Sequence, residues 1–376
     1  MLNIFNFLNL KSYWRNIDKK ILFCFFMLLL LGLFFSFTST SSIVGERLNK
    51  DNYFFFLKHF FFVSLSIVVL LAISIIETKK LKSLIIPFFL LSLFLLIMVP
   101  LIGLEAKGSK RWLDLYFFNL QPIEILKPLF IIMTAKILSK NKLNQKNFLN
   151  YLMSFLLLFT IVILLVNQPD LGQTVLISST WISMIFISGV KISLIFIIFF
   201  IFIFLLLCMI YFSPENFAYI TGRLTNFFDP TRGDNFQTQK ALDAIKLGGL
   251  KGEGMGEGIL KDSVPEAHTD YIISVISEEF GSIISIMVIL IFLYLSFRTI
   301  KYSISENDDF IKLCLCGLTT LLIFQVFIHV GVNTALIPTT GMTLPFLSYG
   351  GSSIIGSSIL AGIILNFTKN RVDENA

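Results

Sequence analysis

The feature that most limits how this chain can fold is a series of about ten apolar runs, most of them near 20 residues long. A helix of that length matches the hydrocarbon thickness of a bilayer. The runs lie at residues 21–39, 59–76, 83–104, 121–138, 149–167, 172–189, 192–212, 271–298, 310–332 and 350–367. They do not alternate with period two, and backbone groups in lipid must bond within their own segment. The runs are therefore predicted to be helices rather than strands of a barrel.

Composition points to the same class. With 55% hydrophobic and only 14% charged residues, the chain resembles polytopic membrane proteins rather than soluble ones. We expect an all-α integral membrane protein, a bundle of about ten transmembrane helices forming a single polytopic domain over residues 1–376. One large extracytoplasmic loop is expected at about 213–270. The first run lacks a small-residue cleavage site and is followed by further spans, so a retained helix is expected rather than a signal peptide.

The basic residues predict an orientation, because cytoplasmic loops of membrane proteins carry an excess of Lys and Arg. One set of short segments holds seventeen of the 30 basic residues, and the opposite short loops hold six. The richer set is Lys11, Arg15, Lys19, Lys20, Lys79, Lys80, Lys82, Lys136, Lys140, Lys142, Lys146, Lys191, Arg298, Lys301, Lys312, Lys369 and Arg371. Both termini are therefore expected in the cytoplasm and the long loop outside. No face concentrates the net charge of +6, so nucleic acid is not an expected partner.

Ionisable residues gather where the long loop re-enters the bilayer. The stretch from Val264 to Gly281 contains five of them: Glu266, His268, Asp270, Glu278 and Glu279. Ionisable groups near hydrocarbon are costly, and a simple membrane anchor would have no reason to place them there. The cluster predicts a polar cavity on the outer side of the membrane, and therefore a substrate.

A second set of charges lies at the start of the run at 121–138. Pro122 suits the first turn of a helix, and Glu124 and Lys127 stand three residues apart on one face. They are interpreted as an acid and a cation presented to a polar ligand, and the alternative is mutual neutralisation at the bundle wall. Asp170, which follows Pro169, either contributes to the site or only ends a helix.

Two irregular segments also stand out. The glycine-rich stretch 248–258 lacks a closing Gly-Lys-Ser/Thr and a preceding strand, so it is no nucleotide loop. A flexible loop is favoured over a nest of N–H groups that would hold a diphosphate. Segment 337–353 contains two prolines and several glycines, and such backbone at membrane depth either lines a wet cavity or is packed closely by small residues. Upstream, 222–230 and 235–240 have the composition of an amphipathic surface segment.

Five motifs carry a family resemblance along essentially the whole chain. They are Gly108-Ser-Lys-Arg-Trp-Leu-Asp-Leu, Gln121-Pro-x-Glu, Gln168-Pro-Asp, Pro265-Glu-Ala-His-Thr-Asp-Tyr-Ile and Pro338-Thr-Thr-Gly-Met-Thr-Leu-Pro-Phe-Leu-Ser-Tyr-Gly-Gly-Ser-Ser. In these motifs the chain resembles the SEDS proteins of bacterial cell-wall synthesis, and it is more similar to their division branch than to their elongation branch. One departure is Ile123, where the family usually has Ser beside the position of Glu124.

The resemblance implies an activity and its partners. It implies a glycosyltransferase of the inner membrane that polymerises lipid II into peptidoglycan. The implied partners are a class B penicillin-binding protein and other division proteins, and the implied location is the septum. Asp270 matches the family's essential aspartate and is expected to be the general base, which contributes about 10²–10⁴-fold in such reactions. Its alternative role is only the N-cap of the helix that follows.

The remaining expected site residues would bind the substrate. The cations would stabilise the departing diphosphate, alone or with a divalent cation such as Mg²⁺ or Mn²⁺, and no cofactor is certain. The set is Lys110, Arg111, Glu124, Lys127, Asp170, Arg223, Glu266, His268, Ser348, Gly350 and Gly351. Two other functions stay open: a flippase for lipid II, and a scaffold without catalysis that recruits the penicillin-binding protein. A flippase should carry polar groups at both ends of its path, whereas here they lie on one side.

Overall fold

The computed structural model describes residues 10–39, 54–106, 109–116, 118–139, 148–190, 218–228, 236–260 and 266–369, together with residues 193 and 200. Within them the chain is helical apart from a small three-stranded antiparallel sheet, ordered β1-β2-β3. The bundle consists of α1 (Leu10–Asn16), α2 (Lys19–Ser39), α4 (Phe54–Ile75), α5 (Thr78–Ile102), α6 (Pro122–Leu138), α7 (Phe148–Asn167), α8 (Leu171–Ile187), α12 (Ile272–Ser305), α13 (Asp309–Asn333) and α14 (Gly351–Phe367).

The predicted all-α membrane bundle is confirmed. Six of the described helices are long and apolar enough to cross a membrane, namely α2, α4, α5, α7, α12 and α13, and α8 and α14 are shorter apolar helices. Helix α6 covers the run that contains Glu124 and Lys127. The run predicted at 192–212 lies almost wholly outside the described residues, so the count of ten helices stays a prediction. The extension of α12 to Ser305 exceeds the predicted end at residue 298.

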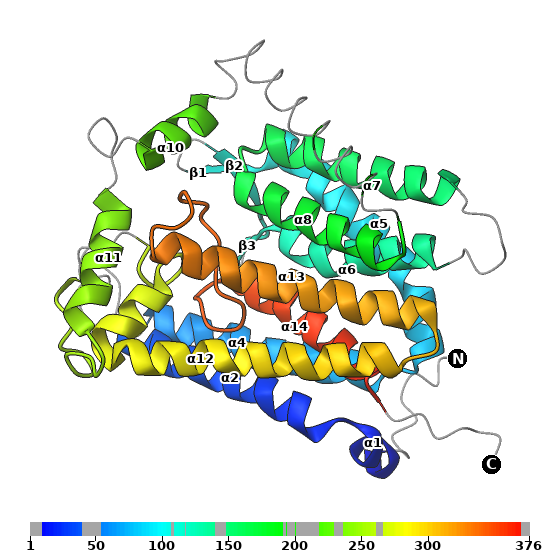
Figure 1. Ribbon diagram of the computed structural model, residues 1–376, viewed down its shortest axis with the longest axis horizontal. Coiled ribbons are helices and arrows are strands. Elements are labelled where there is room, and N and C mark those ends of the chain that lie inside the picture. Colours follow the sequence, from blue (N-terminus) through cyan, green and yellow to red (C-terminus); the bar gives the residue numbers. More distant parts are fainter. Residues whose placement is uncertain are drawn as a thin grey trace.

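Helix α14 occupies the middle of the bundle, where it packs against α4 on one side and α6 on the other (Figure 1). Two glycines permit these contacts. A Cβ on Gly356 would overlap the backbone carbonyl of Glu124 in α6, and one on Gly362 would press on Leu70 and Ile73 in α4. Lipid tails are as apolar as leucine, so close packing rather than the hydrophobic effect holds such helices together.

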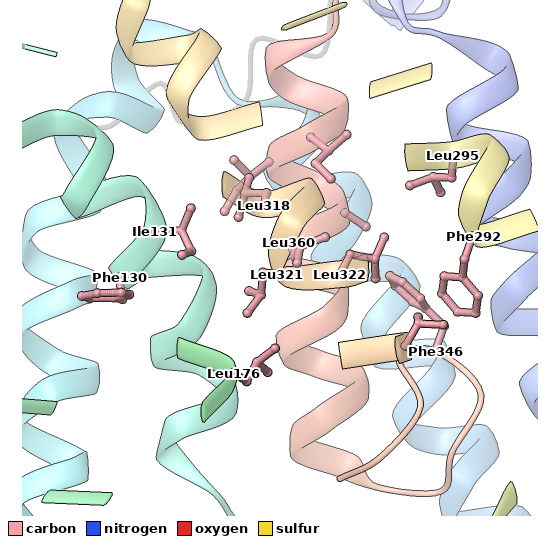
Figure 2. Packing of buried hydrophobic residues seen from close by; sticks show 14 of the residues in the cluster. Phe130, Ile131, Leu176, Phe292, Leu295, Leu318, Leu321, Leu322, Phe346 and Leu360 are labelled. Carbon is pink, nitrogen blue, oxygen red and sulfur yellow. The ribbon is translucent and has the colours of Figure 1, made fainter. Parts of the chain in front are cut away.

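Figure 2 shows the part of the apolar core that lies between α6, α8, α12, α13 and α14, and the same core extends to α2, α4, α5 and α7. In that view Ile131 and Leu176 approach from one side, Phe292 and Leu295 from the other, and Leu318, Leu321, Leu322 and Leu360 lie between them. Phe346 reaches the same core from the irregular segment before α14, and it is fully buried. The core therefore fixes that segment as well as the helices.

The two ends of the bundle differ. The end called here the loop face carries β1 (Leu104–Ala106), β2 (Ser109–Asp114), β3 (Asn119–Leu120), α10 (Ala218–Phe228), α11 (Phe236–Gly248) and the segments 266–271 and 334–350. The opposite end, the short-turn face, carries the connections at 17–18, 76–77 and 306–308. Figure 1 shows α10, α11 and the strands at one end of the long helices, whereas the short helix α1 lies at the other end.

The glycine-rich loop is neither a nest for phosphate nor a flexible linker. It wraps round the start of α12, where Gly281 breaks the helix with φ 83°. Its own N–H groups are used: Glu253 N donates to Glu278 O at 2.9 Å, and Gly254 N donates to Glu279 O at 3.0 Å. The glycines serve close approach, because a Cβ on Gly252 would overlap the carbonyl of Glu279.

Candidate functional site

An irregular segment, residues 337–350, forms the centre of the loop face, and we call it the hub segment. Pro338 and Pro345 lack backbone N–H groups and Gly341 has φ 68°, so a helix cannot continue through it. Its carbonyl groups accept hydrogen bonds from three side chains of two helices, α10 and α13. Arg223 in α10 donates to Thr339 O (3.1 Å), Gln325 in α13 donates to Thr343 O (3.0 Å), and the His329 ring lies 2.8 Å from Met342 O.

Asp270 lies in a tight turn, residues 266–271, that is docked on the hub segment. The turn begins at Glu266, with φ 57°, whose carbonyl accepts from the N–H groups of Thr269 and Asp270, each at 3.0 Å. Ser348 Oγ donates to Thr269 O at 2.6 Å, and Tyr349 N donates to His268 O at 2.9 Å. These bonds hold the backbone on both sides of Asp270.

A buried asparagine that the sequence reasoning missed completes this support. Asn333, the last residue of α13, is fully buried. Its Nδ2 donates to Asp270 O (3.0 Å) and His329 O (2.8 Å), and its Oδ1 accepts from Ser274 N (3.2 Å) and Ser274 Oγ (2.8 Å). The Asn333 amide therefore accepts the hydrogen bonds of Ser274 at the start of α12, and it also holds the backbone of Asp270, the residue expected to be the base. The sequence signal that could have identified Asn333 was its position just before the irregular segment that precedes α14.

The side chain of Asp270 is half-buried and faces the hub segment. A Cβ on Gly341 would lie 3.5 Å from Asp270 Oδ2. The N-cap alternative does not describe this residue, because Tyr271 is the N-cap of α12 and the Ser274 N–H is satisfied by Asn333. Burial raises the pKa of the Tyr271 phenol, and the neighbouring charges of Asp270 and Arg223 act on it with opposite sign.

Aromatic rings surround His268. Its ring lies 5.6 Å from that of Tyr349 and 6.0 Å from that of Phe55, and His59 stacks on Tyr349 at 5.7 Å. Burial raises the pKa of Tyr349 to about 12, so at neutral pH the phenol keeps its proton. Glu266 contacts its own turn through a hydrogen bond from Thr269 Oγ1 to Oε2, at 3.0 Å. Glu266 and Ser348, which were expected to bind the substrate, thus form hydrogen bonds within or to the turn that holds Asp270.

Glu124 and Lys127 form a buried ion pair, which was the alternative to the interpretation that they present an acid and a cation to a ligand. Lys127 Nζ lies 2.9 Å from Glu124 Oε2, and both side chains are at most 4% exposed. Two amides extend the pair: Gln173 Nε2 donates to Glu124 Oε1 at 2.7 Å, and Lys127 Nζ donates to Gln325 Oε1 at 3.3 Å. Because Gln325 also binds the hub segment, this network connects α6, α8 and α13 beneath it.

Asp170 is the N-cap of α8, where its side chain accepts from Gln173 N at 3.4 Å, and it is buried rather than wet. Arg111 of β2 lies 3.9 Å from the Asp170 carboxylate and donates to the carbonyls of Gln168 and Pro169. Arg111 thus fastens the small sheet to the bundle. Lys110, by contrast, is exposed on the hairpin opposite Glu105, so the expected convergence of Lys110 with the buried cations is not seen.

Of the two expected glycines, Gly351 has a packing role, because a Cβ there would approach the Phe62 ring to 2.6 Å. Gly350 is the N-cap of α14 with extended φ, and a Cβ there would meet only ordinary contacts. Among the residues that the structure describes, no three His, Cys, Asp or Glu side chains form a group that could hold a metal ion. The candidate site thus consists of the Asp270 carboxylate beside the hub segment, whose backbone carbonyls accept hydrogen bonds from Arg223 and other side chains.

Comparison with known protein families shows which family this chain is related to. The model of the cell cycle protein family FtsW/RodA/SpoVE matches residues 19–373. The chain belongs to this family. The resemblance predicted from five motifs is confirmed, as is the greater similarity to the FtsW branch.

Two relatives illustrate how complete the match is. The probable peptidoglycan glycosyltransferase FtsW of Caulobacter vibrioides is 35% identical over 360 residues, which cover 96% of this chain and 91% of the relative. Stage V sporulation protein E of Bacillus subtilis is 32% identical, covering 91% of this chain and 94% of the relative.

Solved structures share the fold. A chain from a peptidoglycan synthase complex has a TM-score of 0.77 at 24% identity, covering 94% of this chain and 97% of its own length. RodA of Thermus thermophilus has a TM-score of 0.68 at 22% identity, covering 94% and 96%. The FtsW/RodA fold and the apolar helices make this a multi-pass membrane protein.

Proposed function

We propose that the protein is a peptidoglycan glycosyltransferase that polymerises lipid II, with Asp270 as its general base. Family membership and relatives named as peptidoglycan glycosyltransferases support the activity. The observation that carries the assignment of Asp270 is its turn, whose backbone is held by Ser348, Tyr349 and Asn333 while its half-buried side chain faces the hub segment. A rigid backbone that presents a carboxylate is what proton transfer requires.

In the proposed reaction the donor is a growing glycan on a polyprenyl diphosphate, and the acceptor is a sugar hydroxyl of a second lipid II. The hydroxyl oxygen bonds to the anomeric carbon of the donor, and the bond from that carbon to the diphosphate breaks. Asp270 takes the hydroxyl proton, and the diphosphate leaves with the bonding electrons. The leaving group supplies the driving force. Arg223, which donates to Thr339 O in the hub segment, would stabilise the developing charge of the leaving diphosphate.

The other expected ligands divide between two roles. His268, with its ring at the edge of the aromatic group, and Lys110, exposed on the hairpin, remain candidates for contact with the sugar or peptide of the substrate. Glu124, Lys127, Asp170 and Arg111 make bonds that support the hub segment and its neighbours. We assign these four, together with Glu266, Ser348, Gly350 and Gly351, to positioning. A divalent cation remains a possible aid to the leaving group.

The proposal includes a partner and a location. A relative in fold comes from a peptidoglycan synthase complex, which supports action with a class B penicillin-binding protein and, through the FtsW branch, other division proteins at the septum. The excess of basic residues supports a cytoplasmic short-turn face and termini. Cysteines at two exposed positions in a cysteine-free background test this: Asn307→Cys should react with a permeant maleimide only, and Glu257→Cys also with an impermeant one. The reverse labelling would refute the orientation.

The central experiment gives purified protein labelled lipid II in detergent and in liposomes. Wild type should form glycan polymer, and Asp270→Asn should lower the rate at least about 10²-fold while it remains folded. The matched control is Glu257→Gln, an exposed carboxylate on the same face, which should keep the wild-type rate. Lipid II flipping without polymer would indicate the flippase, and neither activity, with binding of a penicillin-binding protein, would indicate the scaffold. Near wild-type polymerisation by Asp270→Asn would refute its role as base.

A further inference from the structure

A buried histidine in the second turn of α4 has no role in the site described above. His59 is fully buried, and neither of its ring nitrogens has a hydrogen-bond partner among the described residues. A buried polar atom that lacks a partner destabilises the fold, and native proteins contain few such atoms. The imidazole of His59 therefore needs an explanation other than stability.

The sequence around His59 shows that packing alone does not call for an imidazole. Residues 54–62 read Phe-Phe-Phe-Leu-Lys-His-Phe-Phe-Phe, so phenylalanine surrounds the histidine on both sides. A phenyl ring at position 59 would fill a similar volume without burying two nitrogens, which is costly unless they are hydrogen-bonded. The imidazole therefore supplies something that a phenyl ring would not.

The His59 ring contacts the part of the hub segment that holds the turn of Asp270. It stacks on the Tyr349 ring, with the ring centroids 5.7 Å apart and the ring planes at 29°. Tyr349 N in turn donates to His268 O at 2.9 Å, and the rings of these two residues lie 5.6 Å apart. Phe55, one turn earlier in α4, contacts both of those rings. Tyr349 thus connects His59 to the backbone two residues before Asp270.

The two nitrogens of the imidazole can bind an internal water. Such waters typically make about three hydrogen bonds, and they occur where buried polar groups have no other partner. A neutral imidazole has one N–H donor and one bare nitrogen acceptor, so it can donate to a water and accept from one. A water held there would fix the plane of the His59 ring, and with it the Tyr349 ring that is stacked on it.

We propose that His59 is a positioning residue for the glycosyl transfer. Its imidazole, bonded to an internal water, fixes the Tyr349 ring and through it the turn that carries Asp270. The inference rests on the proposed function, which it deepens by adding a residue that supports the base. A carboxylate that takes a proton must be held within about 0.5 Å of its working position, so loss of this support should appear in turnover.

The first test replaces the imidazole by a phenyl ring of similar size. His59→Phe should keep the melting temperature of wild type or raise it, because two unpaired nitrogens leave the interior. It should lower the turnover of lipid II about tenfold and leave the substrate concentration for half-maximal rate unchanged. The matched control is Ser66→Ala, which removes a fully buried oxygen of α4 that also has no partner among the described residues. This control should keep the wild-type turnover.

The second test needs no turnover. The chain contains only three histidines, so isotope-labelled histidine gives a simple magnetic resonance spectrum of the full chain in lipid nanodiscs. Each signal is assigned by the replacement of one histidine. In wild type, the ring nitrogens of His59 should exchange magnetisation with water protons. In His59→Phe the signal of His268 should broaden or split, because its turn is held less firmly, whereas Ser66→Ala should leave that signal unchanged.

The two tests separate this inference from the proposed function. Wild-type turnover in His59→Phe, or an equal loss of turnover in Ser66→Ala, would overturn the positioning role. A His59 ring without water contact in wild type would overturn it whether or not the variant folds, and so would an unchanged His268 signal in His59→Phe. A wild-type protein that makes no polymer would refute the glycosyltransferase proposal, and the His268 signal would then still decide whether His59 holds the turn.

Discussion

Lys82 and Asp308 form an ion pair at 2.7 Å on the short-turn face, where their side chains are 34% and 37% exposed. Lys127 and Glu124 form one at 2.9 Å beneath the loop face, where their side chains are 3% and 4% exposed. Desolvation of a buried pair can exceed its Coulombic gain, so such a pair needs further hydrogen bonds. Gln173 and Gln325 supply them. The Lys82–Asp308 pair joins α5 to the start of α13. The Glu124–Lys127 pair supports the irregular backbone of the hub segment.

Two buried asparagines repeat this contrast. Asn366 on the short-turn face donates to Ile73 O and Ile76 O and accepts from Thr78 Oγ1, so it joins the end of α4 to the start of α5. Asn333 makes an equally complete set of bonds on the loop face, but one of its acceptors is the carbonyl of Asp270. A buried asparagine amide thus closes the turn between α4 and α5 on the short-turn face, and another holds the candidate catalytic residue Asp270 on the loop face.

The largest effect is expected at the buried pair. Glu124→Gln or Lys127→Met leaves one buried charge without its ionic partner and should lower the free energy of unfolding by about 3–5 kcal/mol. Lys82→Met, the matched change at the half-exposed pair, should cost at most about 1 kcal/mol. Denaturant titration in detergent gives both values.

The double variant Glu124→Gln/Lys127→Met decides what the pair does. If the pair supports structure, the double variant should be milder than either single change, because no unpaired charge remains. If Lys127 instead acts on the leaving group, Lys127→Met would lower turnover far more than lipid II binding and the double variant would recover no activity. That result would transfer Lys127 from positioning to catalysis.

The next effect concerns the glycine-rich loop. Gly252 and Gly256 have nearly the same φ, 81° and 84°, but a Cβ on Gly252 would overlap the Glu279 carbonyl, whereas one on Gly256 would meet nothing within 4 Å. Gly252→Ala should therefore be more destabilising than Gly256→Ala by about 1–3 kcal/mol, since the φ penalty cancels between them. Thermal unfolding of both variants measures the difference, and equal values would mean that the loop does not clamp α12.

The helices themselves could be predicted from the sequence because each apolar run carries its own signal. The nine predicted spans that the structure describes all correspond to helices. The place of Glu124 and Lys127 on one helical face was predicted equally well, since they stand three residues apart, but their pairing with each other was only the alternative to contact with a ligand. Asp270 came from the family motif, and its half-buried place beside the hub segment agrees with that choice.

What the sequence could not give depends on contacts between distant segments. Asn333 reads as an ordinary polar residue until its bonds to Asp270 and Ser274, 63 and 59 residues away, are seen. Arg111 was interpreted as a ligand of the substrate, because the sequence around it does not show that its guanidinium binds the backbone carbonyls of residues 168 and 169. The glycine-rich loop was predicted to be flexible because composition does not show which backbone a glycine approaches.

The two asparagines offer a smaller but more specific effect. Asn333→Ala and Asn366→Ala each remove a buried amide with several hydrogen bonds, so both should lower the melting temperature. Only Asn333→Ala should also lower the turnover of the remaining folded protein, by about tenfold or 1.4 kcal/mol, because only Asn333 holds Asp270. The substrate concentration for half-maximal rate should stay near wild type. Equal turnover in both variants would mean that Asn333 only stabilises the fold.

The smallest effect is expected at a third charged group, Asp18 on the short-turn face. Its Oδ2 accepts from Arg298 Nε at 2.8 Å and from Tyr302 OH at 2.7 Å, and its Oδ1 accepts from Ile21 N at 3.0 Å. Burial alone would raise the pKa of Asp18, but these hydrogen bonds outweigh it and hold the pKa below the ordinary value of 3.8.

This shift makes the contribution of Asp18 depend on pH. With a lowered native pKa, the unfolded state binds more protons around pH 3.8, so the contribution is complete above that pH and is lost as pH falls through the native pKa. Asp18→Asn keeps one acceptor oxygen and loses the other, while Arg298 stays partly in contact with solvent, so the change should cost about 1 kcal/mol at neutral pH, the net value of one hydrogen bond. Melting curves of the variant and wild type should converge on acidification, while Glu257→Gln, at an exposed position, should match wild type throughout. A constant difference across the pH range would mean that Asp18 contributes through its shape and hydrogen bonds, and that its charge adds nothing to the short-turn face.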